Sequence, residues 1–206
     1  MTATISRLYD SYADAQRAVT RLESAGVAHS DISIVANNSD NWFDGNKKVD
    51  RDRDGVDDRA ESAGKGAGIG AGLGGAAGLL AGLGLLAIPG LGPVVAAGWL
   101  AATAVGAAAG AATGGIVGAL TEAGVSEEDA HVYAEGVRRG GTLVSARVPD
   151  GDRTRLDAIL NESAVNLRDR SAVWQKSGWK NFDPAAKPYG ADEIRKERQL
   201  YGSGTR

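Results

Sequence analysis

Residues 66–121 read GAGIGAGLGGAAGLLAGLGLLAIPGLGPVVAAGWLAATAVGAAAGAATGGIVGALT, a run of 56 residues without a charged side chain. The run holds 17 Gly, 17 Ala, 16 Leu, Ile or Val, three Thr, two Pro and Trp99. Densely charged segments flank it, so the chain reads as a polar protein that carries a long apolar insert. The whole chain of 206 residues is 43% hydrophobic and 24% charged, which excludes a wholly disordered polymer.

Small residues recur at every fourth position of this insert. They are Gly66, Gly70, Gly74, Gly78 and Gly82, and then Gly98, Ala102, Gly106, Gly110, Gly114 and Gly118. Four-residue spacing places them in one nearly straight row on a helix, and the sequence IPGLGP at 88–93 has the composition of a turn. The pattern predicts a Gly/Ala-rich helical hairpin over 66–121, whose small faces allow close helix packing, as in a glycine zipper.

Two environments would satisfy such a hairpin. Residues 66–88 would span about 34 Å as a helix, close to the roughly 30 Å of a hydrocarbon core. Basic residues flank the insert and the turn has none, which favours a membrane hairpin with both termini in the cytoplasm. The alternative is a soluble cytoplasmic oligomer that buries the hairpin, since a helix that is apolar all round has no face suited to water. Both environments imply self-association through the hairpin.

The segment before the insert, 1–37, shows a strand–helix–strand pattern. Residues 4–9 and 32–35 are β-prone, and between them lies a helix that starts after Ser11 and ends at Gly26. Apolar residues at 15, 18, 19 and 22 form one stripe on that helix. This segment predicts the first half of an α+β domain.

The segment 122–170 repeats this logic. A helix starts after Ser126, a strand follows at 142–148, Asp152 can cap a second helix, and Val165–Leu167 is a short last strand. The βαβ and αβαβ halves predict one antiparallel ferredoxin-like sheet with helices on one face and the helical hairpin inserted between the halves. Residues 171–206 are rich in Gly, Pro, aromatic and charged residues, and we expect a loosely ordered tail there.

The linker 38–65 contains a run of acidic residues with the spacing of a calcium loop. Loop positions 1, 3, 5, 9 and 12 offer oxygens, position 6 is Gly55, and position 7 offers a main-chain carbonyl. The ligand set would be Asp50, Asp52, Asp54, Val56, Asp58 and Glu61. The alternative is a solvated, charge-alternating linker, which the interleaved arginines favour. Calcium is the one cofactor that the sequence suggests.

Composition argues against several classes of function. The chain has no Cys, and no catalytic motif joins a Ser to either of its two His, His29 and His131. A net charge of −3 and a pI near 5.4 argue against a general nucleic-acid binder. We therefore expect no enzymatic activity, no nucleic-acid partner and no small-molecule substrate.

The layout also resembles a known family. The opening TISRLYDSYADAQRAVTRLESAGVAHSDISIV, the Gly/Ala-rich insert and the later SEEDAHVYAEGVRRGGTLVSARV are similar to the bacterial general stress protein 17M-like (heat-induced stress protein) family over about residues 3–148. The resemblance implies a stress-inducible, non-catalytic bacterial protein with a ferredoxin-like module. It supplies no catalytic residues.

Two hypotheses follow for the function. The first is a non-enzymatic stress-response protein held in the bacterial inner membrane by the self-packing hairpin. The second is a soluble oligomeric interaction or sensor module in which the acidic loop 50–61 responds to calcium.

Overall fold

A computed structural model describes residues 2–43, 83–108 and 115–202 of the chain. Seven of the predicted helix-packing residues, Gly66, Gly70, Gly74, Gly78, Gly82, Gly110 and Gly114, lie outside these ranges. So does the whole predicted calcium set, Asp50, Asp52, Asp54, Val56, Asp58 and Glu61. The predictions made for these residues remain predictions.

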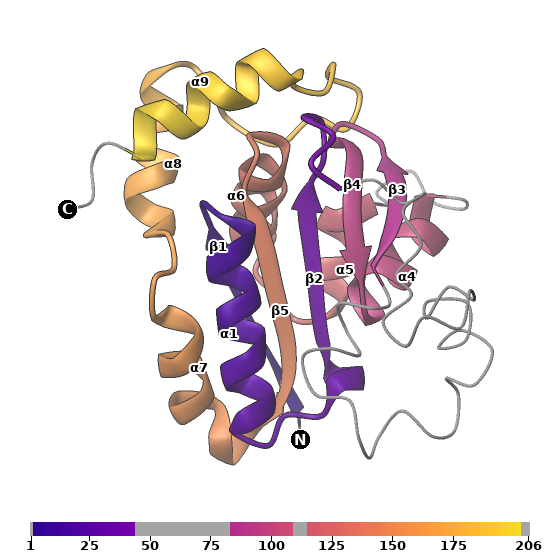
Figure 1. Cartoon of the computed structure of the whole chain (residues 1–206), viewed down its shortest axis with the longest axis vertical. Helices are drawn as coiled ribbons and strands as arrows, with labels where there is room; N and C mark the ends of the chain where they lie inside the picture. The colour runs from indigo at the N-terminus through magenta and orange to yellow at the C-terminus, as the bar shows by residue number, and fades with distance from the viewer. Residues whose placement is uncertain (1, 44–82, 109–114, 203–206) are drawn as a thin grey trace, which may run out of the picture.

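The described residues form a mixed α+β fold around one antiparallel sheet (Figure 1). Its strands are β1 (Thr2–Tyr9), β2 (Ile32–Asn37), β3 (Gly84–Ile88), β4 (Gly92–Ala97) and β5 (Thr142–Pro149). They lie in the order β1-β5-β2-β4-β3, so β1 and β3 are the two edges of the described sheet. The α+β class predicted from the sequence is confirmed.

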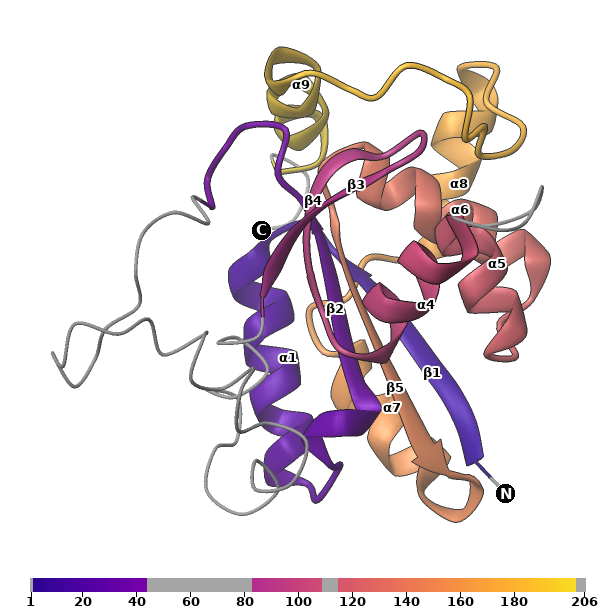
Figure 2. The same cartoon turned by 90° about the vertical axis from the view of Figure 1, so that its right-hand side faces the viewer.

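Helices cover both faces of this sheet (Figure 2). The helices are α1 (Tyr12–Ser24), α4 (Trp99–Ala108), α5 (Gly115–Glu122), α6 (Glu127–Arg138), α7 (Arg153–Asn161), α8 (Leu167–Lys176) and α9 (Ala191–Gly202), with single 3-10 turns at His29–Asp31 and Asp150–Asp152. Helices α1 and α7 pack on one face, and α4, α5 and α6 pack on the other. All six residues of β2 are buried, because this strand is covered on both sides.

Local signals of the two flanking segments give the expected elements. Ser11 and Ser126 cap α1 and α6, each accepting a hydrogen bond from the N–H of the Asp three residues later. Gly26 follows the end of α1 and takes a left-handed φ of +96°. The predicted stripe of α1 is fully buried against the sheet.

The helices expected for the hairpin are wrong at residues 84–88 and 94–97. These residues form the β-hairpin β3–β4, which adds two strands to the sheet beside β2. The chain does reverse at the predicted turn, where Gly90 and Gly92 take left-handed φ values. Val94 and Val95 are β-branched and buried, and β4 has strands on both sides, so the sheet satisfies both its side chains and its backbone.

The ladder positions that the structure describes do not form one helical face. Gly98 lies between β4 and α4, Ala102 and Gly106 lie in α4, and Gly118 lies in α5. Gly98 has a φ of +87°, and a Cβ there would overlap the carbonyl oxygen of Ile32 on β2. Its small size therefore serves a close approach to a strand, whereas the sequence predicted an approach between helices.

The strand order differs from the expected ferredoxin-like topology. Helices pack on both faces of the sheet, whereas the sequence predicted helices on one face. The predicted strand at Val165–Leu167 is also wrong. Val165 makes one backbone hydrogen bond to β1, and Asn166 then caps α8 by accepting from the N–H groups of Arg168 and Asp169. The cap turns the chain away from the sheet after a single contact.

The tail also differs from the expectation of loose order. Residues 171–202 include the end of α8, a connecting segment and α9, which crosses one end of the sheet (Figure 1). Trp174, Phe182 and Ile194 are buried, with exposed fractions of 1%, 6% and 0%. These three apolar anchors hold the tail against the domain, although none of them belongs to a long periodic run.

Candidate functional site

The outer edge of β1 is one of the two edges of the described sheet. Among the described residues β1 pairs with β5 alone, from Thr2 opposite Pro149 to Tyr9 opposite Thr142. The carbonyls of Ser6 and Leu8 accept hydrogen bonds from groups outside the sheet. Since alternate residues of a strand point their backbone groups to opposite sides, Thr2 and Thr4 also face outward.

A groove of about 500 Å³ runs along this edge. Its floor is Thr4–Arg7 of β1. One wall comes from α7, with Arg153, Thr154 and Asp157, and the other comes from the start of α6 and the loop before it. The second wall contains Gly124, Val125, Ser126, Asp129 and Tyr133.

The chain itself covers the far end of the edge. Tyr133 donates its hydroxyl to the carbonyl of Ser6 over 2.5 Å, and burial raises the pKa of this phenol to about 12. Val165 donates its backbone N–H to the carbonyl of Leu8 over 2.8 Å. In the part of the chain that the structure describes, the backbone of Thr4 has no such partner. The edge is therefore closed near Leu8 and open near Thr4.

The two arginines that line the groove, Arg7 and Arg153, differ in their ion pairing. Arg7 reaches across from β1 to Asp157, with 2.7 Å between Nη2 and Oδ2, and also donates to the carbonyl of Ser6. Arg153 is exposed and makes no ion pair with any residue of the described ranges. The α7 wall thus offers one cation to a ligand that carries negative charge, and the facing wall carries the carboxylate of Asp129.

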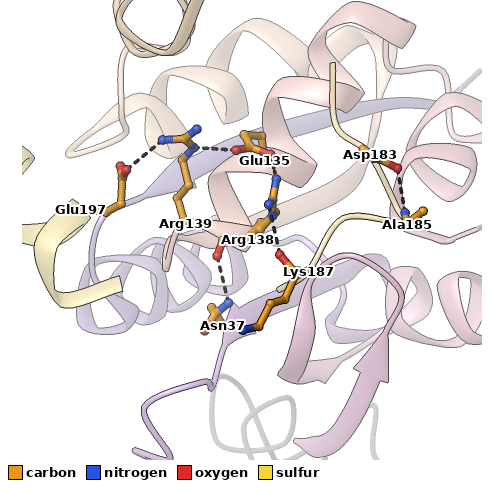
Figure 3. A network of polar contacts seen from close by, with 8 residues as sticks. All are labelled: Asn37, Glu135, Arg138, Arg139, Asp183, Ala185, Lys187 and Glu197. Carbon is orange, nitrogen blue, oxygen red and sulfur yellow. Dashed lines mark hydrogen bonds and ion pairs between the residues drawn. The ribbon is translucent and has the colours of Figure 1, made fainter. Parts of the chain in front are cut away.

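A second polar cluster lies at the end of α6, where the tail crosses it (Figure 3). Glu135 is fully buried, and its two oxygens accept from Arg138 over 3.2 Å and Arg139 over 2.6 Å. Arg139 also contacts Glu197 of α9 over 2.8 Å, and Arg138 donates to the carbonyl of Lys187. Burial opposes the charge of Arg139, but its hydrogen bond and attraction to Glu135 outweigh that and raise its pKa.

This second cluster binds the tail and α8 to the body of the fold. The guanidinium of Arg139 lies 4.9 Å from the ring centre of Trp174, and that of Arg138 lies 4.8 Å from the ring centre of Tyr189. Arg170 of α8 binds both carboxylate oxygens of Asp10, over 2.9 and 3.0 Å. Beside these residues is a cavity of about 10 Å³, the size of one water molecule. These contacts hold the tail and α8 against the body of the fold.

The sequence predicted neither the groove beside β1 nor the buried cluster around Glu135. An unpaired edge is a property of strand order, which local patterns do not report. The buried cluster has a visible signal, because Glu135, Arg138 and Arg139 stand at i, i+3 and i+4 of a predicted helix. That spacing does not show whether the three side chains are buried or face water.

No protein-family model, curated protein or solved structure matches the chain. Within the described ranges, no group of three His, Asp or Glu side chains is placed to hold a metal ion. Among the helices of those same ranges, none has the length and apolarity needed to cross a bilayer.

Proposed function

We propose that the protein is a non-enzymatic interaction module that binds an extended segment of a partner protein along β1. The single observation that carries this proposal is the open edge at Thr4, which lies at the floor of a groove with walls on both faces of the sheet. Exposed strand edges are templates for strand addition, in which main-chain hydrogen bonds supply affinity and side-chain contacts supply specificity.

The groove suits one added strand. A neighbouring strand lies about 4.8 Å away, and the walls from α7 and α6 flank that position above and below the sheet. The guest would exchange hydrogen bonds with Thr4 and with the N–H of Ser6. Thr4, Ser126 and Thr154 line the groove with hydroxyl-bearing side chains, and Arg153 favours an acidic residue on the guest.

The finer topology fits this proposal. Strands β1, β5 and β2 lie side by side with β5 antiparallel to both of its neighbours. These are the order and directions of three of the four strands of a ferredoxin-like sheet, whose fourth strand would lie against the outer edge of β1. We take the groove to be the position of that fourth strand. A non-enzymatic module also agrees with what the stress-protein resemblance implies.

The test is a binding assay on an array of random linear octapeptides with labelled full-length protein. Thr4→Pro removes the outward N–H without breaking a β1–β5 hydrogen bond, while Thr4→Val changes the side chain and keeps the N–H. The proposal expects a set of peptides rich in β-branched and acidic residues that the wild type and Thr4→Val bind and Thr4→Pro binds at least tenfold more weakly. Peptides that bind all three proteins equally, or an array with no binder, would overturn it.

A further inference from the structure

We propose that the groove beside β1 selects a partner segment in which acidic and basic residues alternate, with the acidic side chains against α7 and the basic side chains against α6. This inference rests on the function proposed above and names the chemistry of the partner. It follows from charges of opposite sign on the two walls of the groove, Arg153 on one and Asp129 on the other.

The two faces of β1 lead to different walls. Ile5 packs in the core cluster that contains residues of α1 and α7, whereas Leu8 packs in the cluster that contains residues of α6. Because successive residues of a strand point to opposite faces, the side chain of Thr4 points to the α6 face. A guest residue paired with Thr4 points to that same face, and its two neighbours along the guest point to the α7 face. The side chains of a guest strand therefore alternate between the two walls.

The α7 wall attracts an acidic side chain. Arg153 is exposed and has no ion-pair partner in the described ranges. Other charges on this side are already matched, since Arg7 pairs with Asp157 over 2.7 Å. Asp152, the residue before Arg153, pairs with Arg155 over 3.2 Å. No side chain caps α7, so the positive end of its dipole adds to the charge of Arg153.

The α6 wall attracts a basic side chain. Asp129 is exposed, and its carboxylate accepts from the hydroxyl of Ser126 over 2.7 Å but pairs with no cation of the described ranges. Glu127 and Glu128 share the first turn of α6 with Asp129. Three carboxylates therefore stand at this helix end, and together they outweigh its positive partial charge of about half an elementary charge.

Arg147 of β5 is the nearby cation that has to be considered against this assignment. It lies opposite Thr4 and points to the same face. Its guanidinium is already engaged, because Nε lies 3.7 Å from a carboxylate oxygen of Asp31 and the group lies 4.7 Å from the ring centre of Trp99. Both partners lie on the β2 side of β5, so Arg147 leaves the charge of Asp129 available to a guest.

These charges specify a pattern of three guest residues. The residue opposite Thr4 is basic, since it points to the wall that carries Asp129. Both of its neighbours are acidic, since they point to the wall that carries Arg153. A uniformly acidic segment would place like charge against Asp129, and a uniformly basic one would place like charge against Arg153.

The test measures the binding of three octapeptides to the full-length protein at low ionic strength. VDRDRDRV alternates acid and base, whereas VDTDTDTV and VRTRTRTV carry charge on one face only. We expect VDRDRDRV to bind at least threefold more tightly than either of the other two, since each charged contact is exposed to solvent. This difference should shrink at high salt.

Two neutralising variants assign the walls. Arg153→Gln removes the cation, and Asp129→Asn removes the anion but keeps an oxygen to which Ser126 can donate. Arg153→Gln should weaken the binding of VDTDTDTV at least threefold and should not weaken that of VRTRTRTV. Asp129→Asn should do the reverse. Each variant thus keeps one peptide as the control for its own folding.

Two outcomes would overturn the inference. One is equal binding of the three peptides by the wild type, and the other is an equal loss of VDTDTDTV binding in both variants. If the random array yields peptides that Thr4→Pro loses but none of the three designed peptides binds, the proposed function stands and the inference about charge fails. If the array yields no binder, the proposed function fails and the inference falls with it.

Discussion

The hydroxyl of Ser33, on β2, accepts a hydrogen bond from the backbone N–H of Leu100, at the start of α4, over 3.2 Å. The same hydroxyl donates to the carbonyl of Ala97 over 2.7 Å, and Ser33 is fully buried. One side chain of the flanking domain thus satisfies two backbone groups where the insert passes from strand to helix. The apolar insert is joined to the α+β domain at this point.

Ser33→Ala should destabilise the fold by about 1–3 kcal/mol, because it leaves the buried N–H of Leu100 and the carbonyl of Ala97 without their shared partner. Urea unfolding followed by circular dichroism measures this as a lower midpoint at an unchanged slope. Ser24→Ala is the matched control, since the Ser24 hydroxyl is exposed and bonds only within α1. Equal midpoints for the two variants would contradict the role of Ser33.

Gly98→Ala should cost more than Gly26→Ala, although both glycines have a left-handed φ. A Cβ at Gly26 meets open space, so only the conformational penalty of about 1 kcal/mol applies. At Gly98 the same Cβ overlaps the backbone of Ile32 and Ser33, which must move apart. We expect Gly98→Ala to have the lower midpoint in urea by a clear margin. The reverse order would show that β2 and the start of α4 are not in close contact.

The flanking segments were predictable because their signals are local. Ser11, Ser126 and the stripe of α1 report helix starts and faces within one or two turns of chain. The strands of the insert were not predictable, because the four-residue spacing of its small residues indicates a helix and Ala itself favours a helix. Val94 and Val95 became a strand because β2 offered an unpaired edge, and that edge is visible only once the sheet is assembled.

Glu135→Ala should be among the most damaging single changes. It leaves Arg138 and Arg139, with side chains only 15% and 12% exposed, without their shared carboxylate. Breaking a buried pair from one side costs about 3–5 kcal/mol, and the remaining contact of Arg139 with Glu197 keeps the loss toward the lower end. Glu162→Ala removes the exposed partner of Arg21 and should cost under about 1 kcal/mol.

The tail provides a second measurement for Glu135→Ala. Trp174 stacks under Arg139, so loosening the cluster should shift tryptophan emission to the red below the global unfolding midpoint. Glu162→Ala should show one coincident transition by fluorescence and circular dichroism. Coincident transitions in both variants would mean that Glu135 does not secure the tail.

The groove could be predicted only in part. Ser126 and Asp129, which line one wall, were identified as a helix start from their spacing. Arg153 and Thr4 carry no pattern of their own, and they share a site because β1 lacks an outer neighbour along the described sheet. Val165 shows the limit most clearly. Its sequence favours a strand, but the cap of Asn166 comes one residue later and takes precedence.

Alkaline pH should unfold the protein through its buried tyrosines. Burial raises the pKa of Tyr12 and Tyr133 to about 12, and it raises that of Tyr9 further. A folded-state pKa above the unfolded value of about 10 means that the fold binds the phenolic proton more tightly. The resulting stabilisation is complete below pH 10 and is lost as the pH rises from there toward 12.

Urea midpoints at pH 9, 10 and 11, with tyrosinate absorbance at 295 nm, measure this loss. Tyr133→Phe should lower the midpoint at pH 9 by removing the hydrogen bond to Ser6, about 1 kcal/mol since Arg7 also bonds that carbonyl. It should also make the decline above pH 10 shallower, because one raised phenol is gone. A decline as steep as that of the wild type would show that Tyr133 ionises as readily in the fold as in the unfolded chain.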